Sequence, residues 1–284
     1  MNYYIIIPAH NEERFIALTL ESVINQTLLP KKMVIVNDNS SDATENIIDR
    51  YIAKHPWIEK VNKSSSNEHL PGSKVIEAFN EGLKKLDDDY DFIVKLDADL
   101  VLPENYFQSI GNTFANNTKV GIAGGFAYEQ QNEGGEWKLN HPMNKDHVRG
   151  AFKAYSNTCF KKIGGLRNSM GWDTVDELLA QFHDFIIHTD ESLKVKHLRP
   201  TGKSYNKKAK YMQGEAMYKM RYGSAITYIA ALKMAIKNKK IAILFDCLKG
   251  YRFSKKKKIQ FIVSEKEGAF IRKLRWNGIL SKLK

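Results

Sequence analysis

Near its N-terminus the chain reads Tyr3-Tyr4-Ile5-Ile6-Ile7-Pro8-Ala9-His10-Asn11-Glu12-Glu13, an apolar run of strand length that passes directly into a polar cluster. The same transition occurs where Met33–Val36 meets Asn37–Asp42, and where Phe92–Leu96 meets Asp97-Ala98-Asp99. Helical patterns separate these runs. The alternation predicts an α/β protein with a single, mostly parallel sheet flanked by helices.

The first expected helix runs from Asn11 or Glu12 to Asn25. Asp42 is expected to cap the next one, because Glu45 follows three residues later. In an open sheet of this kind, ligands bind beyond the carboxyl ends of the strands. All three polar clusters fall there, so they predict one shared binding site.

Two carboxylates of the third cluster, Asp97 and Asp99, project from the sheet edge on the same side. They repel each other unless a positive charge lies close by. Mg²⁺ meets this need, because one or two carboxylates and substrate phosphates usually hold it. Asp38 could accept a hydrogen bond from a nucleobase, Pro8-Ala9 could pack against the base, and Glu12 could reach a ribose hydroxyl. No glycine-rich phosphate loop follows the first strand.

The three clusters together resemble the N-terminal signatures of the family 2 glycosyltransferases of the bacterial surface-polysaccharide type. Ala78-Phe79-Asn80-Glu81-Gly82 resembles a further segment of that family. The glycine that the family usually places just before this segment is displaced to Gly72, and Lys74 lies in between.

The resemblance implies the GT-A fold and an inverting, hexosyltransferase-type transfer from a nucleotide sugar, UDP-linked by preference, to a glycan or lipid-linked acceptor. A divalent ion, Mg²⁺ or Mn²⁺, would stabilise the leaving diphosphate. Asp99 would coordinate the metal, and His197 would be a second ligand beside a phosphate-contacting Arg199. The residues assigned to the nucleotide sugar are Pro8, Ala9, His10, Glu12, Asp38, Lys74, Asp97 and Ala98.

A carboxylate general base for the acceptor hydroxyl is expected in Gly171-Trp172-Asp173-Thr174-Val175-Asp176-Glu177, at the start of a predicted helix. Asp176 is the preferred base, with Asp173 the close alternative and Glu177 the third candidate. The helix dipole also favours acidic residues at this position, which accounts for at least one of them. Trp172 is expected to line the acceptor pocket, because sugar faces pack on aromatic rings.

The net charge of +12 is concentrated near the C-terminus. Residues 1–200 hold 22 Lys and Arg against 28 Asp and Glu, a net −6, and residues 201–284 hold 22 against 4, a net +18. Apolar residues there recur every three or four positions. We therefore expect a catalytic domain over 1–212 and a basic amphipathic helical region over 213–284 that docks on an anionic membrane surface. Nucleic acid is not an expected partner.

The expected location is the cytoplasm, with the enzyme held peripherally at the inner face of the plasma membrane. The N-terminus lacks a signal-peptide pattern, and two widely separated cysteines suit a reducing compartment. Two other function classes remain open. One is a sugar-phosphate nucleotidyltransferase, which normally needs a basic glycine-rich loop where this chain has Glu12 and Glu13. The other is a non-enzymatic basic protein that binds membranes or RNA.

Overall fold

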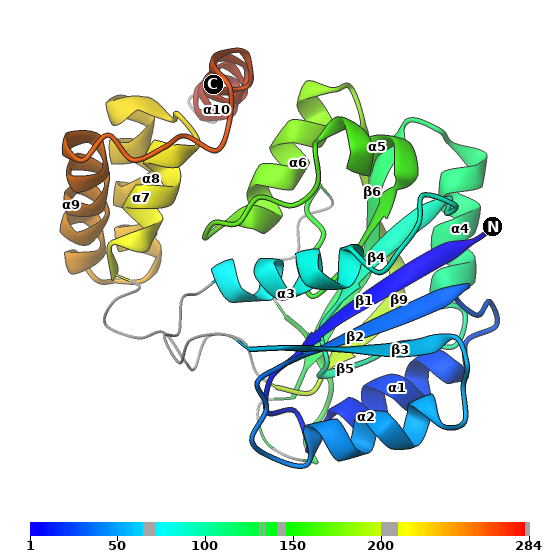
Figure 1. Cartoon of the computed structure of the whole chain (residues 1–284). Helices are drawn as coiled ribbons and strands as arrows, with labels where there is room; N and C mark the ends of the chain where they lie inside the picture. Colours follow the sequence, from blue (N-terminus) through cyan, green and yellow to red (C-terminus); the bar gives the residue numbers. More distant parts are fainter. Residues whose placement is uncertain (65–71, 131, 133, 141–145, 200–209, 282–284) are drawn as a thin grey trace.

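The computed structural model describes residues 1–64, 72–130, 132, 134–140, 146–199 and 210–281. Within them, one sheet has the strand order β3-β2-β1-β4-β8-β6-β9-β5, with β7 paired to β6 (Figure 1). The strands are β1 (Tyr3–Ala9), β2 (Lys32–Asp38), β3 (Ile58–Lys63), β4 (Phe92–Leu96), β5 (Leu100–Val101), β6 (Val120–Glu129), β7 (Lys138–Leu139), β8 (Phe152–Ser156) and β9 (Ile186–His197).

Helices pack on both faces of this sheet. They are α1 (Ile16–Ile24), α2 (Thr44–Ile52), α3 (Ser73–Leu83), α4 (Tyr106–Asn116), α5 (Asn157–Lys162) and α6 (Trp172–Phe182). Alternate residues of β1 serve the two faces: the Tyr3 ring lies 4.9 Å from that of Phe107 in α4, whereas Ile6 contacts Gly82 of α3. Because both faces are covered, the parallel strands are continuous apolar runs.

The predicted sheet is confirmed: β1, β2, β3 and β4 pair in parallel, and so do β6 and β9. The first helix begins later than expected, at Ile16, because Asn11 adopts a left-handed conformation with φ 55° and the chain turns before the helix starts. Asp42 does not hold the N-cap position, which falls on Ala43, although its carboxylate accepts a hydrogen bond from Thr44 N at 3.0 Å.

The short strand β5 shapes the site. It follows the Asp97-Ala98-Asp99 cluster directly and pairs antiparallel with the end of β9, where Leu100 lies opposite His197. β9 in turn lies beside β6, with Glu129 opposite His197. Three segments far apart in the sequence therefore meet at one edge of the sheet.

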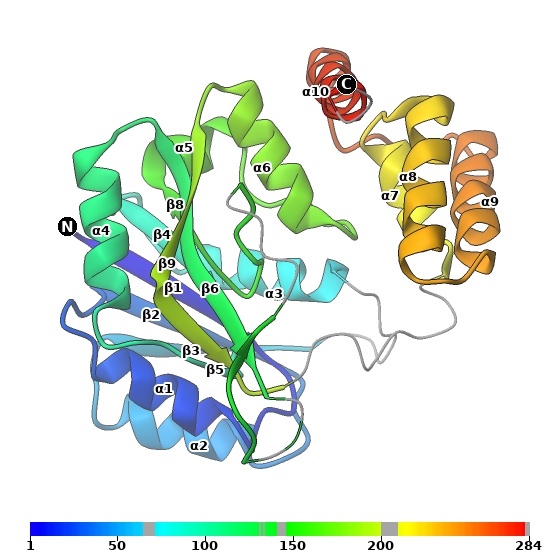
Figure 2. The same ribbon diagram turned by 180° about the vertical axis from the view of Figure 1, so that it is seen from behind.

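Four further helices follow: α7 (Met212–Lys219), α8 (Gly223–Lys237), α9 (Ala242–Lys256) and α10 (Glu265–Leu280). Figures 1 and 2 place α7, α8 and α9 beside the sheet domain, with α10 close to α6. The rings of Phe182 in α6 and Phe270 in α10 lie 5.6 Å apart. The apolar core continues from the sheet into this region through residues such as Met217, Ile226 and Ile271.

The longest helices of the described part of the chain are too short or too polar to cross a lipid bilayer.

Candidate active site

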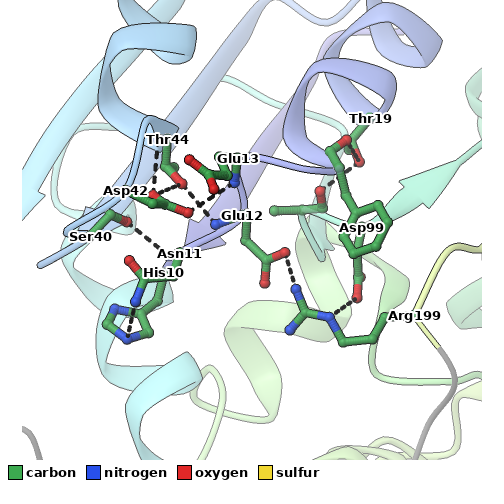
Figure 3. Close-up of polar contacts among 12 residues, drawn as sticks. His10, Asn11, Glu12, Glu13, Thr19, Ser40, Asp42, Thr44, Asp99 and Arg199 are labelled. Atoms are coloured by element: carbon green, nitrogen blue, oxygen red, sulfur yellow. Dashed lines mark hydrogen bonds and ion pairs between the residues drawn. The ribbon is translucent and has the colours of Figure 1, made fainter.

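The loops after β1 and β2 are tied together by their polar side chains. Asn11 and Asn39 both have positive φ angles, 55° and 58°, which turn the two loops toward each other. Asn11 Oδ1 accepts a hydrogen bond from Ser41 N at 2.8 Å. Glu12 N donates to Thr44 Oγ1 at 2.7 Å (Figure 3). These contacts fix the position of Glu12 at the carboxyl edge of the sheet.

Asp99 and His197 face each other at that edge. His197 Nε2 lies 3.4 Å from Asp99 Oδ1, and its Nδ1 lies 3.4 Å from Glu129 Oε1. Burial by itself would lower the pKa of His197, but the carboxylates around it raise the pKa instead. Likewise, burial opposes ionisation of Asp99, but His197 and Arg199 outweigh it and lower the pKa of Asp99.

Arg199 lies two residues after the end of β9. It lies between the loop after β1, which carries Glu12, and the turn that carries Asp99. Its guanidinium forms an ion pair with Glu12, and its Nε lies 3.8 Å from Asp99 Oδ2 (Figure 3). Burial raises the pKa of Glu12 to about 7, with Asp99 and Asp97 adding to the effect and Arg199 opposing it. The structure thus gathers Glu12, Asp99, His197 and Arg199 into one cluster.

Thr19 of α1 fixes the Asp97-Ala98-Asp99 turn through two hydrogen bonds. Thr19 Oγ1 donates to Ala98 O at 2.8 Å and accepts from Leu100 N at 3.0 Å. Asp97 forms an ion pair with Lys95, a buried lysine whose Nζ lies 5.3 Å from the centre of the Trp172 ring. Trp172 is buried and is the first residue of α6. Lys95 therefore connects Asp97 to the start of α6.

Asp38, the other predicted base-binding residue, ends β2 in a buried position. Its Oδ1 has no hydrogen-bond partner among the described residues and lies 3.6 Å from Lys63 Nζ. His10 Nδ1 donates to the Asp38 carbonyl at 2.6 Å, so His10 braces this loop. Pro8 and Ala9 end β1 beside it, and Lys74 lies in the first turn of α3.

The three acidic residues of α6 differ in their surroundings. Asp173 is half-buried, whereas Asp176 and Glu177 are buried and bind Lys153, whose Nζ lies 3.0 Å from Asp176 Oδ1 and 2.9 Å from Glu177 Oε1. Asp176 also accepts a hydrogen bond from the Tyr155 hydroxyl. Burial raises the pKa of Asp176 to about 6.

Asp99 and His197 are the residues that fit a divalent ion. A carboxylate oxygen and an imidazole nitrogen are both common metal ligands, and these two atoms lie 3.4 Å apart, Asp99 in the turn before β5 and His197 at the end of β9. The described residues contain no group of three or more His, Cys, Asp or Glu side chains arranged to hold a metal. If this pair held an ion, phosphate oxygens and water would supply the other ligands.

Lysines in the strands were missed by the sequence analysis. Lys63, Lys95 and Lys153 each contact a predicted site carboxylate. Lys95 and Lys153 were detectable, because each is the one cation of an otherwise apolar strand pattern, Phe92–Leu96 and Phe152–Tyr155. A lysine in a buried strand needs an anionic partner.

Comparison with known proteins gives a consistent picture. A profile described as "Glycosyl transferase family 2" matches residues 4–170, more than half of the chain. The minor teichoic acid biosynthesis protein GgaA of Bacillus subtilis is 29% identical over 146 residues, which cover 50% of this chain and 31% of that protein. Poly-beta-1,6-N-acetyl-D-glucosamine synthase of Staphylococcus epidermidis is 29% identical over 123 residues, which cover 42% and 27%. The chain therefore spans well under half the length of both relatives.

Two solved structures share the fold. Residues 1–349 of S. aureus TarS, in complex with UDP-GlcNAc, align with a TM-score of 0.59 and 17% identity, covering 95% of this chain and 78% of that one. The mannosyltransferase PcManGT from Pyrobaculum calidifontis, in complex with GDP-Man and Mn²⁺, aligns with a TM-score of 0.55 and 16% identity, covering 100% and 81%. At identities this low, the comparison shows the fold alone. The structural alignment confirms the predicted GT-A fold.

Proposed function

Because the chain belongs to glycosyl transferase family 2, we propose that it transfers a sugar from a nucleoside diphosphate sugar, UDP-linked by preference, to a hydroxyl of a glycan or lipid-linked acceptor. The observation that carries the proposal is the meeting of Glu12, Asp99 and His197 at the carboxyl edge of the sheet. This edge is where an open α/β sheet binds its ligands.

Asp38 is the proposed partner of the nucleobase. Its buried Oδ1 lacks a hydrogen-bond partner among the described residues, and a base N–H would supply one. Glu12 and Asp97 are assigned to the ribose side, and Pro8-Ala9 to the wall against which the base packs. Lys74, in the first turn of α3, is kept in the donor site as a residue proposed to contact the diphosphate.

Asp99 and His197 are the proposed ligands of Mg²⁺ or Mn²⁺. When bound, the ion supplies positive charge at the diphosphate, which gains negative charge as the glycosidic bond breaks. Arg199 adds a second positive charge next to Asp99, with its Nε 3.8 Å from Asp99 Oδ2. Lys95 holds Asp97 in place through their ion pair.

We assign the general base to Asp173, the alternative of the sequence analysis, because it is the α6 carboxylate with an open side. Asp173 borders a cleft, whereas the carboxylate of Asp176 is enclosed by Lys153 and Tyr155. In the inverting reaction, the acceptor oxygen attacks the anomeric carbon as its proton passes to the Asp173 carboxylate, and the nucleoside diphosphate leaves from the opposite face. Asp176 and Glu177 anchor α6 on Lys153.

The direct test is a binding screen by thermal shift with UDP, GDP and CDP sugars, each with and without Mn²⁺, followed by measurement of nucleoside diphosphate release. A ligand that binds the native state alone raises stability by RT ln(1 + [L]/Kd), so the shifts rank the nucleotides. We expect the UDP sugars to give the largest shift and Mn²⁺ to increase it. Absence of a shift with every nucleotide sugar would refute the function.

An anionic lipid surface is the proposed partner of α9. Phe245 and Phe253 are 64% and 57% exposed, and they line a shallow hollow together with Lys249, Arg252 and Lys256. Aromatic rings flanked by cations on one helix face are typical of interfacial membrane binding. This docking would bring the catalytic site to the inner leaflet, where a lipid-linked acceptor resides.

Cosedimentation with vesicles tests this surface. The protein should pellet with vesicles that contain anionic phosphatidylglycerol and stay in solution with pure phosphatidylcholine, and the double variant Phe245→Ser/Phe253→Ser should lose the binding. The matched control is Tyr228→Ser, which removes an exposed aromatic ring of α8. Equal binding to both vesicle types, or retention of single-stranded RNA in preference to vesicles, would contradict the proposal.

A further inference from the structure

A second hollow is bordered by Asp173, and none of the residues proposed to bind the donor lines it. Its volume is about 590 Å³, and it is enclosed by the start of α6 and by α7, α8 and α10. Most of its wall is apolar: the main contributors are Met217, Met220, Ile226, Ile229, Leu274 and Ile279. We refer to it as the helical cleft.

A chain of contacts links the helical cleft to the proposed donor site. Asp173 and Thr174 border the cleft, while the preceding Trp172 lies close to two lysines that pair across β4 and β8, with Lys95 Nζ 5.3 Å and Lys153 Nζ 5.9 Å from the ring centre. Lys95 is the lysine that binds Asp97. These contacts therefore connect Asp97, a residue of the proposed donor site, to the start of α6 at the border of the helical cleft.

Two cations accompany the apolar wall. Lys233 of α8 and Arg275 of α10 both line the cleft. Arg275 is oriented by Tyr222, whose hydroxyl accepts hydrogen bonds from its Nε at 3.1 Å and from its Nη2 at 2.9 Å. An apolar wall with two positive side chains suits a molecule that has an apolar part and an anionic group.

Space remains open along α10. A Cβ atom built on Gly278 would meet no heavy atom within 4 Å, and the same is true at Gly171, next to the start of α6. Half-exposed apolar side chains such as Ile229 and Leu274 face the cleft instead of being packed into the core. A bound apolar chain would remove this surface from water.

We propose that the helical cleft binds the acceptor, and that the acceptor is amphiphilic: its hydroxyl lies at Asp173, its apolar chain lies against α7, α8 and α10, and a phosphate group contacts Lys233 and Arg275. This inference rests on the proposed function, because it takes Asp173 as the base. It adds the class of acceptor and the residues that select it.

Binding of alkyl phosphates to the whole chain tests the inference. In calorimetric titrations below their micelle concentrations, hexyl, octyl and decyl phosphate should bind with increasing affinity, by up to about fourfold for each methylene that becomes fully buried. Methyl phosphate and decyl glucoside should bind on the order of tenfold more weakly than decyl phosphate, since each lacks one of the two recognised parts.

Gly278→Trp should fill the cleft and remove the dependence on chain length, whereas the control Gly278→Ala should keep it. Lys233→Glu should weaken the binding of decyl phosphate on the order of tenfold and leave the binding of decyl glucoside unchanged. This variant provides the test if Gly278→Trp fails to fold. Phe245→Ser serves as a control for binding at α9 and should behave like the unaltered protein.

UDP with Mn²⁺ is titrated into the same samples. If UDP binds but the alkyl phosphates bind equally to the unaltered protein, Gly278→Trp and Lys233→Glu, the helical cleft is not the acceptor site and the proposed function stands. If UDP and nucleotide sugars fail to bind, the proposed function fails, whatever the alkyl phosphates do.

Discussion

Asp173 and Asp176 lie one turn apart on α6, yet their carboxylates have different surroundings. Asp173 faces the helical cleft and offers its backbone carbonyl to Lys153 Nζ at 2.6 Å, whereas the carboxylate of Asp176 is bound by Lys153 and Tyr155 and is 1% exposed. A base must reach the acceptor proton, which favours Asp173.

Substitution of these two residues should therefore separate catalysis from stability. Asp173→Asn should lower kcat on the order of 10²- to 10⁴-fold, with an almost unchanged melting temperature and unchanged UDP binding. Asp176→Asn should lower the melting temperature, because it leaves Lys153 with one of its two carboxylate partners. Steady-state kinetics and thermal unfolding distinguish the two. A fully active, stable Asp173→Asn variant would rule out Asp173 as the base.

The pH dependence of stability gives a second test of Asp176. Its pKa is raised by burial to about 6, so the folded protein takes up this proton before the unfolded chain does. The carboxyl group therefore adds stability as the pH falls through about 6 toward 4, and that gain is lost as the pH rises again. Asp176→Asn lacks the gain.

The free energy of unfolding should consequently fall further in Asp176→Asn at pH 5 than at pH 7.5, by about 1 kcal/mol. Urea unfolding at both pH values measures this difference, with Asp88→Asn, at an exposed surface position, as the matched control. An equal or smaller loss at pH 5 would show that the pKa of Asp176 is not raised.

At the scale of single residues, the sequence predicted that the polar residues after β1, β2 and β4 lie close together, and the structure confirms it. Parallel strands bring their carboxyl ends to one edge of the sheet. It could not predict which carboxylates are enclosed. That outcome depends on Lys153 and Tyr155 of β8, which reach α6 through a long-range packing that no local pattern encodes. The sequence pattern alone favours Asp176 as the base, and the enclosure of its carboxylate is the reason that we propose Asp173.

At the scale of elements, the contact between α7 and α9 depends on two glycines. A Cβ on Gly214 would lie 1.9 Å from Cys247 O, and one on Gly250 would lie 2.1 Å from Tyr211 O, so the two helix backbones approach too closely for any side chain. Gly278, in α10, has open space instead.

Gly250→Ala should therefore destabilise the protein by about 1–3 kcal/mol, since the backbones must move apart. Gly278→Ala should stabilise it by about 0.5–1 kcal/mol through the higher helix propensity of alanine. Chemical denaturation of the two variants compares the same substitution in two environments. Equal effects would mean that α7 and α9 are not in contact at Gly250.

The sequence predicted elements well where an apolar run ended in polar residues, as in β1, β2 and β4. It expected a basic amphipathic helical region over 213–284 and did not predict the division of this region into α7, α8, α9 and α10. In α10 the buried positions are Gly268 and Ile271. They stand among Lys and Arg residues, so the apolar face of this helix was not recognisable in the sequence. β5 was missed because two residues form no recognisable pattern, although this strand places His197 beside Asp99.

At the scale of the whole molecule, the core joins the sheet domain to the C-terminal helices. Residues of α7, α8 and α10 belong to the same apolar cluster as the strands. The separation at 212/213 that the charge distribution predicts remains a prediction. The proposed acceptor site needs both parts, because α6 supplies Asp173 and the C-terminal helices supply the apolar walls.

The central claim is that Asp99 and His197 hold a divalent ion that binds the diphosphate of the donor. Calorimetric titration of UDP with and without Mn²⁺, into the unaltered protein, Asp99→Asn and the exposed-site control Asp88→Asn, tests it most directly. We expect Mn²⁺ to tighten UDP binding by about tenfold or more in the unaltered protein and the control, and to have little effect in Asp99→Asn. The same enhancement by Mn²⁺ in Asp99→Asn would contradict the account.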